Sequence, residues 1–155
     1  MQSNWKEYLL RQARDKHMCS ENFRLLSACT SKEEAVELYK RTIDWALEEN
    51  YPPLAVLKQD FGHMEDSGIY VGHVFHGEML KDQQVYVFHN CEGTIHVGLN
   101  IDKKIIPMLY FANGCRMTVR CDDEIRVPLY VFGDNQVYAN RASGCDFRIF
   151  NFDVK

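Results

Sequence analysis

The sequence predicts an α+β protein in which an N-terminal helical segment, residues 1–62, packs on a C-terminal β-solenoid, residues 63–155. Two observations carry this prediction. Apolar residues follow a helical period as far as Gly62, and short β-rich runs separated by Gly, Asn and Asp replace that period afterwards. The β-rich runs also repeat at about twenty residues, a period typical of solenoids.

The composition is globular: 46% of the 155 residues are hydrophobic, and the net charge of −4 comes from interspersed charges of both signs. No basic cluster is present for a phosphate backbone, so we expect no nucleic-acid partner. No apolar run approaches the ~20 residues of a membrane span, and the first residues lack a signal-peptide pattern. We therefore expect a cytoplasmic protein with no membrane partner. Its six cysteines should be reduced, and none forms a CxxC pair.

Four amphipathic helices are expected in residues 1–62. Ser20 can cap the second helix, and Ser31 with Glu34 has the form of a capping box at the start of a long third helix. Pro53 can open a short fourth helix. An open end of a solenoid exposes unpaired backbone and apolar core, so we expect this segment to cap one end of the β array.

The candidate strands are 69–75, 84–88, 94–99, 105–111, 117–121, 126–132, 136–139 and 147–152. In a solenoid each repeat is one coil, and about four coils are expected here. Residues 131–140, Val-Phe-Gly-Asp-Asn-Gln-Val-Tyr-Ala-Asn, resemble the short Asn/Gly-turn coils of β-helical repeat proteins. The alternative is an antiparallel β-sandwich or barrel in which each unit is a hairpin.

The repeat predicts two ladders of equivalent side chains. One consists of tyrosines at matching strand positions, Tyr70, Tyr86, Tyr110 and Tyr130. The other consists of small thiols at one corner, Cys91, Cys115 and Cys145. An exposed tyrosine ladder could stack on sugars or contact a protein, whereas a buried ladder is core.

No catalytic signature such as G-x-S-x-G, HExxH or a phosphate-binding glycine loop is present, and no cofactor is expected. The candidates for a metal site are four histidines of the β-rich segment, His73, His76, His89 and His96. A site requires two or more of these imidazoles to converge. Cys91 is close in sequence to His89, so a thiol–imidazole pair is a second hypothesis.

Charged residues offer two further candidates in the same segment. Asp122, Asp123 and Glu124 form an acidic run that could bind Ca²⁺, although a solvated turn is the simpler interpretation. The other candidate is one exposed face of the solenoid. Its charged groups, arranged as in enzymes that act on polysaccharides, would be Asp102, Lys103, Arg120, Asp122 and Arg141.

The final strand motivates the preferred hypothesis, a non-catalytic structural or protein-interaction module that self-associates. Alternation places Phe150 and Phe152 on one face of that strand, and Phe147 and Ile149 on the other. An apolar terminal strand offers both a backbone edge and an apolar face, so we expect a homo-oligomer, most simply a C₂ dimer. A monomer would result if the helices folded back over the last coil. The alternative function is a carbohydrate- or metal-binding protein or enzyme that uses one face of the β segment.

Overall fold

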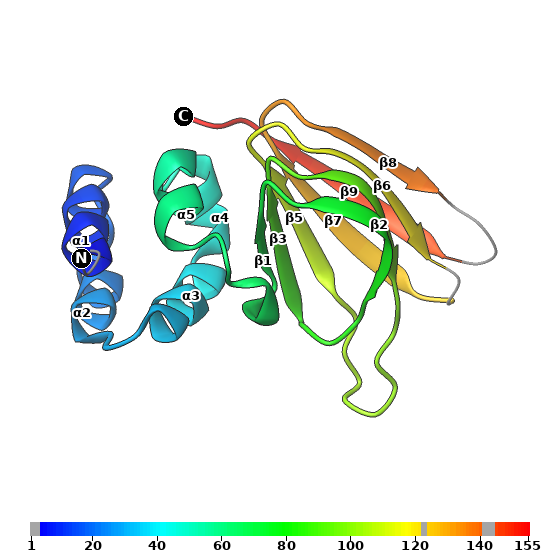
Figure 1. Cartoon of the computed structure of the whole chain (residues 1–155), viewed down its shortest axis with the longest axis horizontal. Helices are drawn as coiled ribbons and strands as arrows, with labels where there is room; N and C mark the ends of the chain where they lie inside the picture. Colours follow the sequence, from blue (N-terminus) through cyan, green and yellow to red (C-terminus); the bar gives the residue numbers. More distant parts are fainter. Residues whose placement is uncertain (1–3, 122–123, 141–144) are drawn as a thin grey trace.

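The computed structural model describes residues 4–121, 124–140 and 145–155, and it confirms the predicted α+β architecture. Helices come first, and parallel strands then wind into a β-solenoid of about four turns (Figure 1). Within these residues, no helix is both long enough and apolar enough to cross a lipid bilayer.

The helices of the described chain are α1 (Trp5–Asp15), α2 (Ser20–Ala28), α3 (Lys32–Arg41), α4 (Ile43–Glu48) and α5 (Leu54–Asp60), followed by a 3₁₀ turn, η1 (Glu65–Ser67). The cap predicted for α3 is confirmed, because the Glu34 backbone N–H donates to Ser31 Oγ at 3.2 Å. The prediction of one long third helix is wrong, because the structure divides it at Thr42 into α3 and α4. The Thr42 hydroxyl donates to the carbonyl of Leu38 at 3.1 Å, a bond of the kind that bends helices.

The strands are β1 (Ile69–Val71), β2 (Val74–Leu80), β3 (Val85–His89), β4 (Glu92–Val97), β5 (Met108–Ala112), β6 (Arg116–Cys121), β7 (Arg126–Phe132), β8 (Gln136–Asn140) and β9 (Asp146–Phe152). They form a five-stranded sheet in the order β1-β3-β5-β7-β9 and a four-stranded sheet in the order β2-β4-β6-β8. Every pairing between these strands is parallel. Each coil therefore crosses from one sheet to the other and back, which excludes the antiparallel sandwich or barrel.

The first predicted strand, 69–75, divides at a corner between the two sheets. Gly72 has φ +64° at this corner, a left-handed conformation that a residue without a Cβ adopts without strain. The second half, β2, continues to Leu80 and contains a bulge at Gly77, where its register with β4 shifts. This continuation was not predicted from the sequence, because the alternation of apolar residues is lost at the bulge.

The predicted tyrosine ladder is wrong in its first half. Tyr110 pairs with Val87 rather than with Tyr86, because the corner after β3 is one residue shorter than the corner after β5. A slip of one residue moves a side chain to the opposite face of the sheet. Tyr86 therefore faces the space between the two sheets, whereas Tyr110 and Tyr130 face the helices.

The predicted thiol column holds for two of its three members. Cys91 and Cys115 precede β4 and β6 at the same corner, and Asn135 takes the next place in the column. Cys145 lies elsewhere, since it precedes β9 of the other sheet. All cysteines except the exposed Cys19 are buried, and their thiols are free of disulfides.

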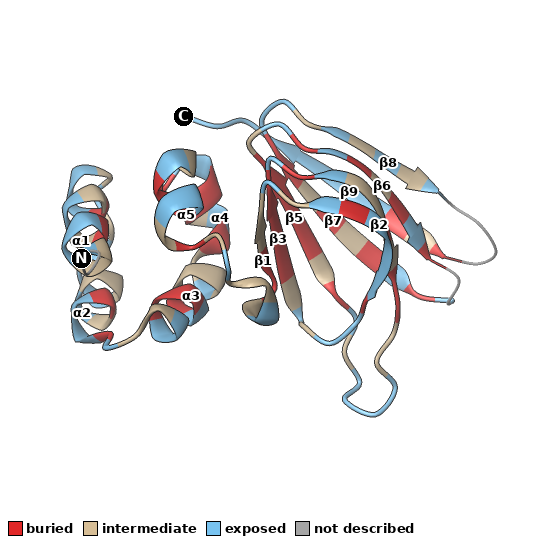
Figure 2. Cartoon of the chain, viewed as in Figure 1, coloured by how far each residue is buried: buried red, intermediate tan, exposed pale blue. Residues whose placement is uncertain are grey.

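Two hydrophobic cores result from this arrangement. One lies between the two sheets, and the other lies between the outer face of the five-stranded sheet and the helices. The expectation that the helices cap an end of the solenoid is wrong: they cover a lateral face, with α1 and α2 forming a layer outside α3, α4 and α5 (Figure 1). β3 and β5 are buried on both faces for this reason, as the extensive red along them in Figure 2 shows.

Candidate functional site

The four histidines proposed for a metal site do not converge. His76 and His96 project from the outer face of the four-stranded sheet, whereas His89 is buried beneath the helices on the five-stranded sheet. His73 lies at the β1–β2 corner and packs against Phe75, with ring centroids 4.5 Å apart. Across the residues that the structure describes, no three His, Cys, Asp or Glu side chains are placed to hold a metal ion.

His89 instead connects the helices to the solenoid. Its Nε2 lies 2.7 Å from the hydroxyl oxygen of Tyr39 on α3, and its Nδ1 lies 2.8 Å from Nδ2 of Asn113 at the next corner. Burial lowers the pKa of His89 to about 3, so the imidazole is neutral. A neutral imidazole has one donor and one acceptor nitrogen, and both find a partner here. This is a structural contact, and no pattern in the sequence predicted it.

The thiol–imidazole hypothesis fails on the same geometry. The Cys91 thiol lies 3.5 Å from the carbonyl oxygens of Tyr70 and His89 and contacts backbone rather than the imidazole. Hydrogen bonding with Cys115, together with burial, raises the pKa of the Cys91 thiol well above its ordinary value. A buried, protonated thiol is a poor nucleophile. Cys91 therefore belongs to the core.

The charged residues proposed for a polysaccharide or Ca²⁺ site are only partly within the described chain. Asp102 and Lys103 lie in the exposed turn between β4 and β5, and Arg120 projects from the outer face of the four-stranded sheet. Glu124 is exposed. The remaining three candidates, Asp122, Asp123 and Arg141, lie outside the described residues.

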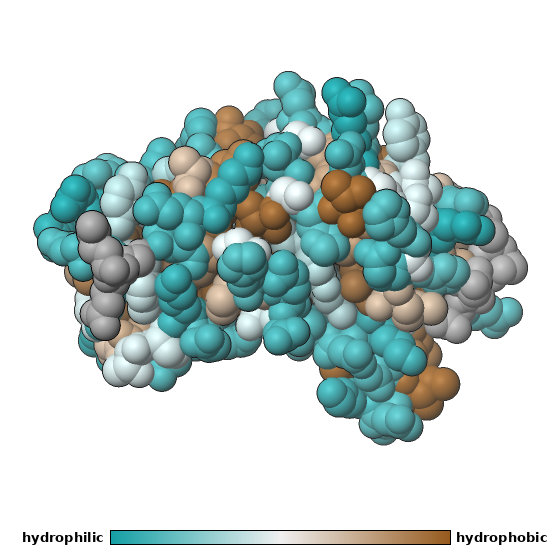
Figure 3. All heavy atoms as spheres, viewed as in Figure 1, coloured by the Kyte–Doolittle hydropathy of each residue, from teal (hydrophilic) through white to brown (hydrophobic). Residues whose placement is uncertain are grey.

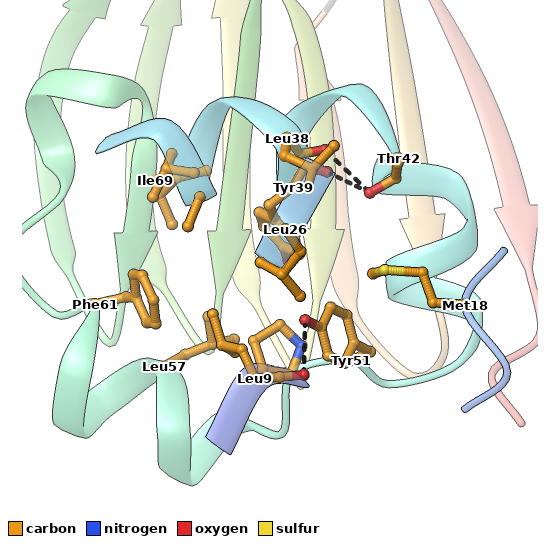
Figure 4. Close-up of a pocket in the computed structure, with 13 residues that line it drawn as sticks. Leu9, Met18, Leu26, Leu38, Tyr39, Thr42, Tyr51, Leu57, Phe61 and Ile69 are labelled. Atoms are coloured by element: carbon orange, nitrogen blue, oxygen red, sulfur yellow. Dashed lines mark hydrogen bonds between the residues drawn. The ribbon is translucent and has the colours of Figure 1, made fainter. Parts of the chain in front are cut away.

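Two recesses of the described structure differ in size and in lining. The first is an apolar cavity between the helices and β1, lined by residues such as Leu9, Leu26 and Ile69 (Figure 4). Its volume of about 30 Å³ has room for only about two water molecules. The second is an open cleft of about 570 Å³ along the corner where Lys58, Glu92 and Arg116 lie. No aromatic side chain is among the described residues that line this cleft, so it lacks a platform on which a sugar ring could stack.

The strongest surface feature is at the last coil. Three side chains of β9 are about equally exposed, Ile149 at 41% and Phe150 and Phe152 at 42% each; we call these three residues the terminal patch. The fourth interface candidate, Phe147, is wrong as a surface residue, because it is 2% exposed in the core between the sheets. The face of the molecule seen in Figure 3 is mostly hydrophilic, with apolar side chains in small separate groups.

The two phenylalanines of the terminal patch continue the aromatic rows that the helices cover. Phe150 stacks on Tyr130 with ring centroids 5.3 Å apart, and Tyr130 stacks on Tyr110 at 4.6 Å. Phe152 stacks on Phe132 at 4.7 Å. No residue of β9 belongs to the core beneath the helices. The helical layer therefore stops short of the last strand and leaves Phe150 and Phe152 partly exposed.

The backbone edges at the two ends of the solenoid differ. At the first coil, β1 is three residues long and β2 is bulged at Gly77, and both features discourage pairing with another chain. At the last coil, β9 is seven residues long, pairs with β7 alone among the described strands and keeps an unbroken register. Nε of Arg148 lies 3.9 Å from Oδ2 of Asp146, so the opposite charges of these two side chains offset each other.

The three residues of the terminal patch were therefore predicted from the sequence, whereas Phe147, predicted together with them, is buried. The signal was the apolar composition on both faces of the last strand. Alternation separates Phe150 and Phe152 from the buried Phe147, but it places the exposed Ile149 on the same face as Phe147. Comparison of this chain with protein-family models, curated proteins and solved structures found no match.

Proposed function

We propose that this chain is a non-catalytic structural or protein-interaction module that self-associates through its last coil. The observation that carries the proposal is the coincidence, on one strand, of an unprotected backbone edge and the exposed terminal patch. Edge strands of soluble proteins are usually short, bulged or charged; β9 is long and regular, and the opposite charges of its Asp146 and Arg148 side chains offset each other.

A second copy of the chain is the partner because the surface is small and apolar. Each side chain of the terminal patch keeps about two fifths of its surface exposed, so its complete burial contributes about 1 kcal/mol. Six such side chains from two copies then contribute about 6 kcal/mol, which at most offsets the cost of association, so the net affinity must come from backbone hydrogen bonds along the β9 edge. The expected dissociation constant is micromolar or weaker, and the complex must be sought at high protein concentration.

Sedimentation velocity and light scattering test the proposal. The protein concentration should range from about 1 to 500 µM, because the expected dissociation constant is micromolar or weaker. We expect the mass to rise from the 18.1 kDa monomer toward the dimer. Phe150→Asp should hold the protein at the monomer mass, because it places a charge in the interface. Ile101→Asp is the matched control: Ile101 is 78% exposed in the turn between β4 and β5 and should leave association unchanged. A monomer mass for the unmodified chain at every concentration would refute the proposal.

A further inference from the structure

The hydrogen bonds of β9 to β7 determine which backbone groups remain for a partner. The Asp146 N–H donates to the Ile125 carbonyl, and the Gly133 N–H donates to the Phe152 carbonyl. In a parallel pair, both polar groups of a residue point to the same side and alternate along the strand. The polar groups of Asp146, Arg148, Phe150 and Phe152 therefore point toward β7, whereas those of Ile149 and Asn151 point away from it.

We infer that two copies of the chain join by antiparallel pairing of β9 with β9, around a two-fold axis that passes beside Phe150. This inference rests on the proposed self-association and adds its geometry. Ile149 of one copy then lies opposite Asn151 of the other, and the two residues exchange both of their N–H···O=C bonds. The symmetry axis produces the same pair a second time. The backbone groups that β7 leaves unused are thus the ones that this arrangement requires.

The side chains favour this register over its neighbours. The axis is perpendicular to the sheet, so each side chain stays on its own face and Phe150 meets its own copy in a close, non-hydrogen-bonded pair. Phe152 meets Arg148 of the other copy, a pair suited to a cation–π contact. A register centred on Arg148 would instead oppose two guanidinium groups, which is unfavourable. A register centred on Ile149 would place Phe152 against Asp146.

The arrangement also agrees with the position of the helices. Pairing along β9 joins the two five-stranded sheets edge to edge. Both helical layers then lie on the same side of the combined sheet, because the perpendicular axis keeps faces unchanged. Helices do not cover β9, so they leave its edge open, and the phenylalanines of both terminal patches lie in the trough between the two layers.

Disulfide trapping tests the register directly. In a Cys19→Ser background, which removes the exposed native thiol, single cysteines are placed at each of the positions 148–152 and oxidised at a concentration where the chain is dimeric. Phe150→Cys should cross-link at least tenfold faster than the other four, because only a residue on the axis meets its own copy at disulfide distance. Ile101→Cys controls for random collision. A fastest rate at any other position, or equal rates at all five and at position 101, would overturn the inference.

Amide hydrogen exchange gives a second readout that needs no substitution. The amides of Arg148 and Phe150 should be protected at every concentration, since they bond to β7. The amides of Ile149 and Asn151 should exchange about tenfold more slowly where nine tenths of the chain is dimeric. Dimerisation without this slowing would overturn the pairing while leaving self-association intact. Absence of any dimer would remove both proposals together.

Discussion

Acid should destabilise this fold through His89, which is 1% exposed and contacts Tyr39 and Asn113. Its pKa is lowered by burial from an ordinary value of 6.5 to about 3. Because the folded value is the lower one, the unfolded chain binds a proton that the folded chain does not. The stabilisation is therefore complete above pH 6.5 and is lost as the pH falls toward 3.

The loss is large compared with ordinary protein stability. Each unit of pH below 6.5 removes about 1.4 kcal/mol, so about 3 kcal/mol is lost by pH 4 from this one side chain. Small domains have about 5–15 kcal/mol in total. Protonation would also break one of the two contacts of the imidazole, since an imidazolium can only donate. The helical layer and the solenoid should therefore lose their connection at α3 first.

Urea unfolding of the unmodified chain and of His89→Gln, measured from pH 7.5 to pH 4, tests this reasoning. The glutamine keeps a polar side chain at this position but cannot take up a proton, so the variant should be less stable at neutral pH and less sensitive to acid. His76→Gln is the control, because His76 is exposed on β2 and its replacement should leave the pH profile unchanged. Parallel pH profiles for the unmodified chain and His89→Gln would show that His89 does not carry the effect.

Two further predictions, each with a matched control substitution, concern a glycine and a cysteine of the solenoid. Gly93→Ala should lower the free energy of unfolding by about 3 kcal/mol or more, because Gly93 has φ +110° and the added Cβ would overlap the Phe75 carbonyl oxygen. Gly114 has φ +82° but open space where the Cβ would lie, so Gly114→Ala should lower it by only about 1 kcal/mol in the same urea assay. Cys115→Asp should lower the free energy of unfolding by several kcal/mol, because it buries an unpaired charge at a residue that is 1% exposed. Cys19→Asp is the control, because Cys19 is exposed and its replacement should change the unfolding midpoint little. Equal midpoints for the two variants would contradict the burial of the thiol column.

The sequence predicted the solenoid because its signals are local. Each coil has a short apolar strand, a corner with Gly or Asn, and another strand. These units recur at a nearly constant spacing, so the repeats can be aligned directly in the sequence. Register is a different matter, since it depends on the length of every corner. One residue fewer after His89 moved Tyr86 to the opposite face from Tyr110, and no propensity scale reports such a shift.

The position of the helices could be inferred only in part. One predicted strand is apolar on both faces, which predicts that each face packs against another part of the structure. Its residues are Val85, Tyr86, Val87 and Phe88. The sequence does not say whether that part belongs to the same chain or to another copy. The Tyr39–His89 contact, which joins residues fifty positions apart, decides in favour of the chain's own helices. Such a contact is fixed by tertiary packing and leaves no periodic trace in the sequence.

The lateral position of the helices changes where self-association can occur. If the helices had capped one end of the β array, as the sequence suggested, only the other end would have been open. With the helices on a face, both ends are open, and each must limit pairing by its own means. The first coil does so with a three-residue strand and a bulge at Gly77. The last coil has neither device and carries the terminal patch as well. This asymmetry favours a closed pair of last coils over an open filament, because a filament would require the first coil to accept a strand as readily as the last one offers it.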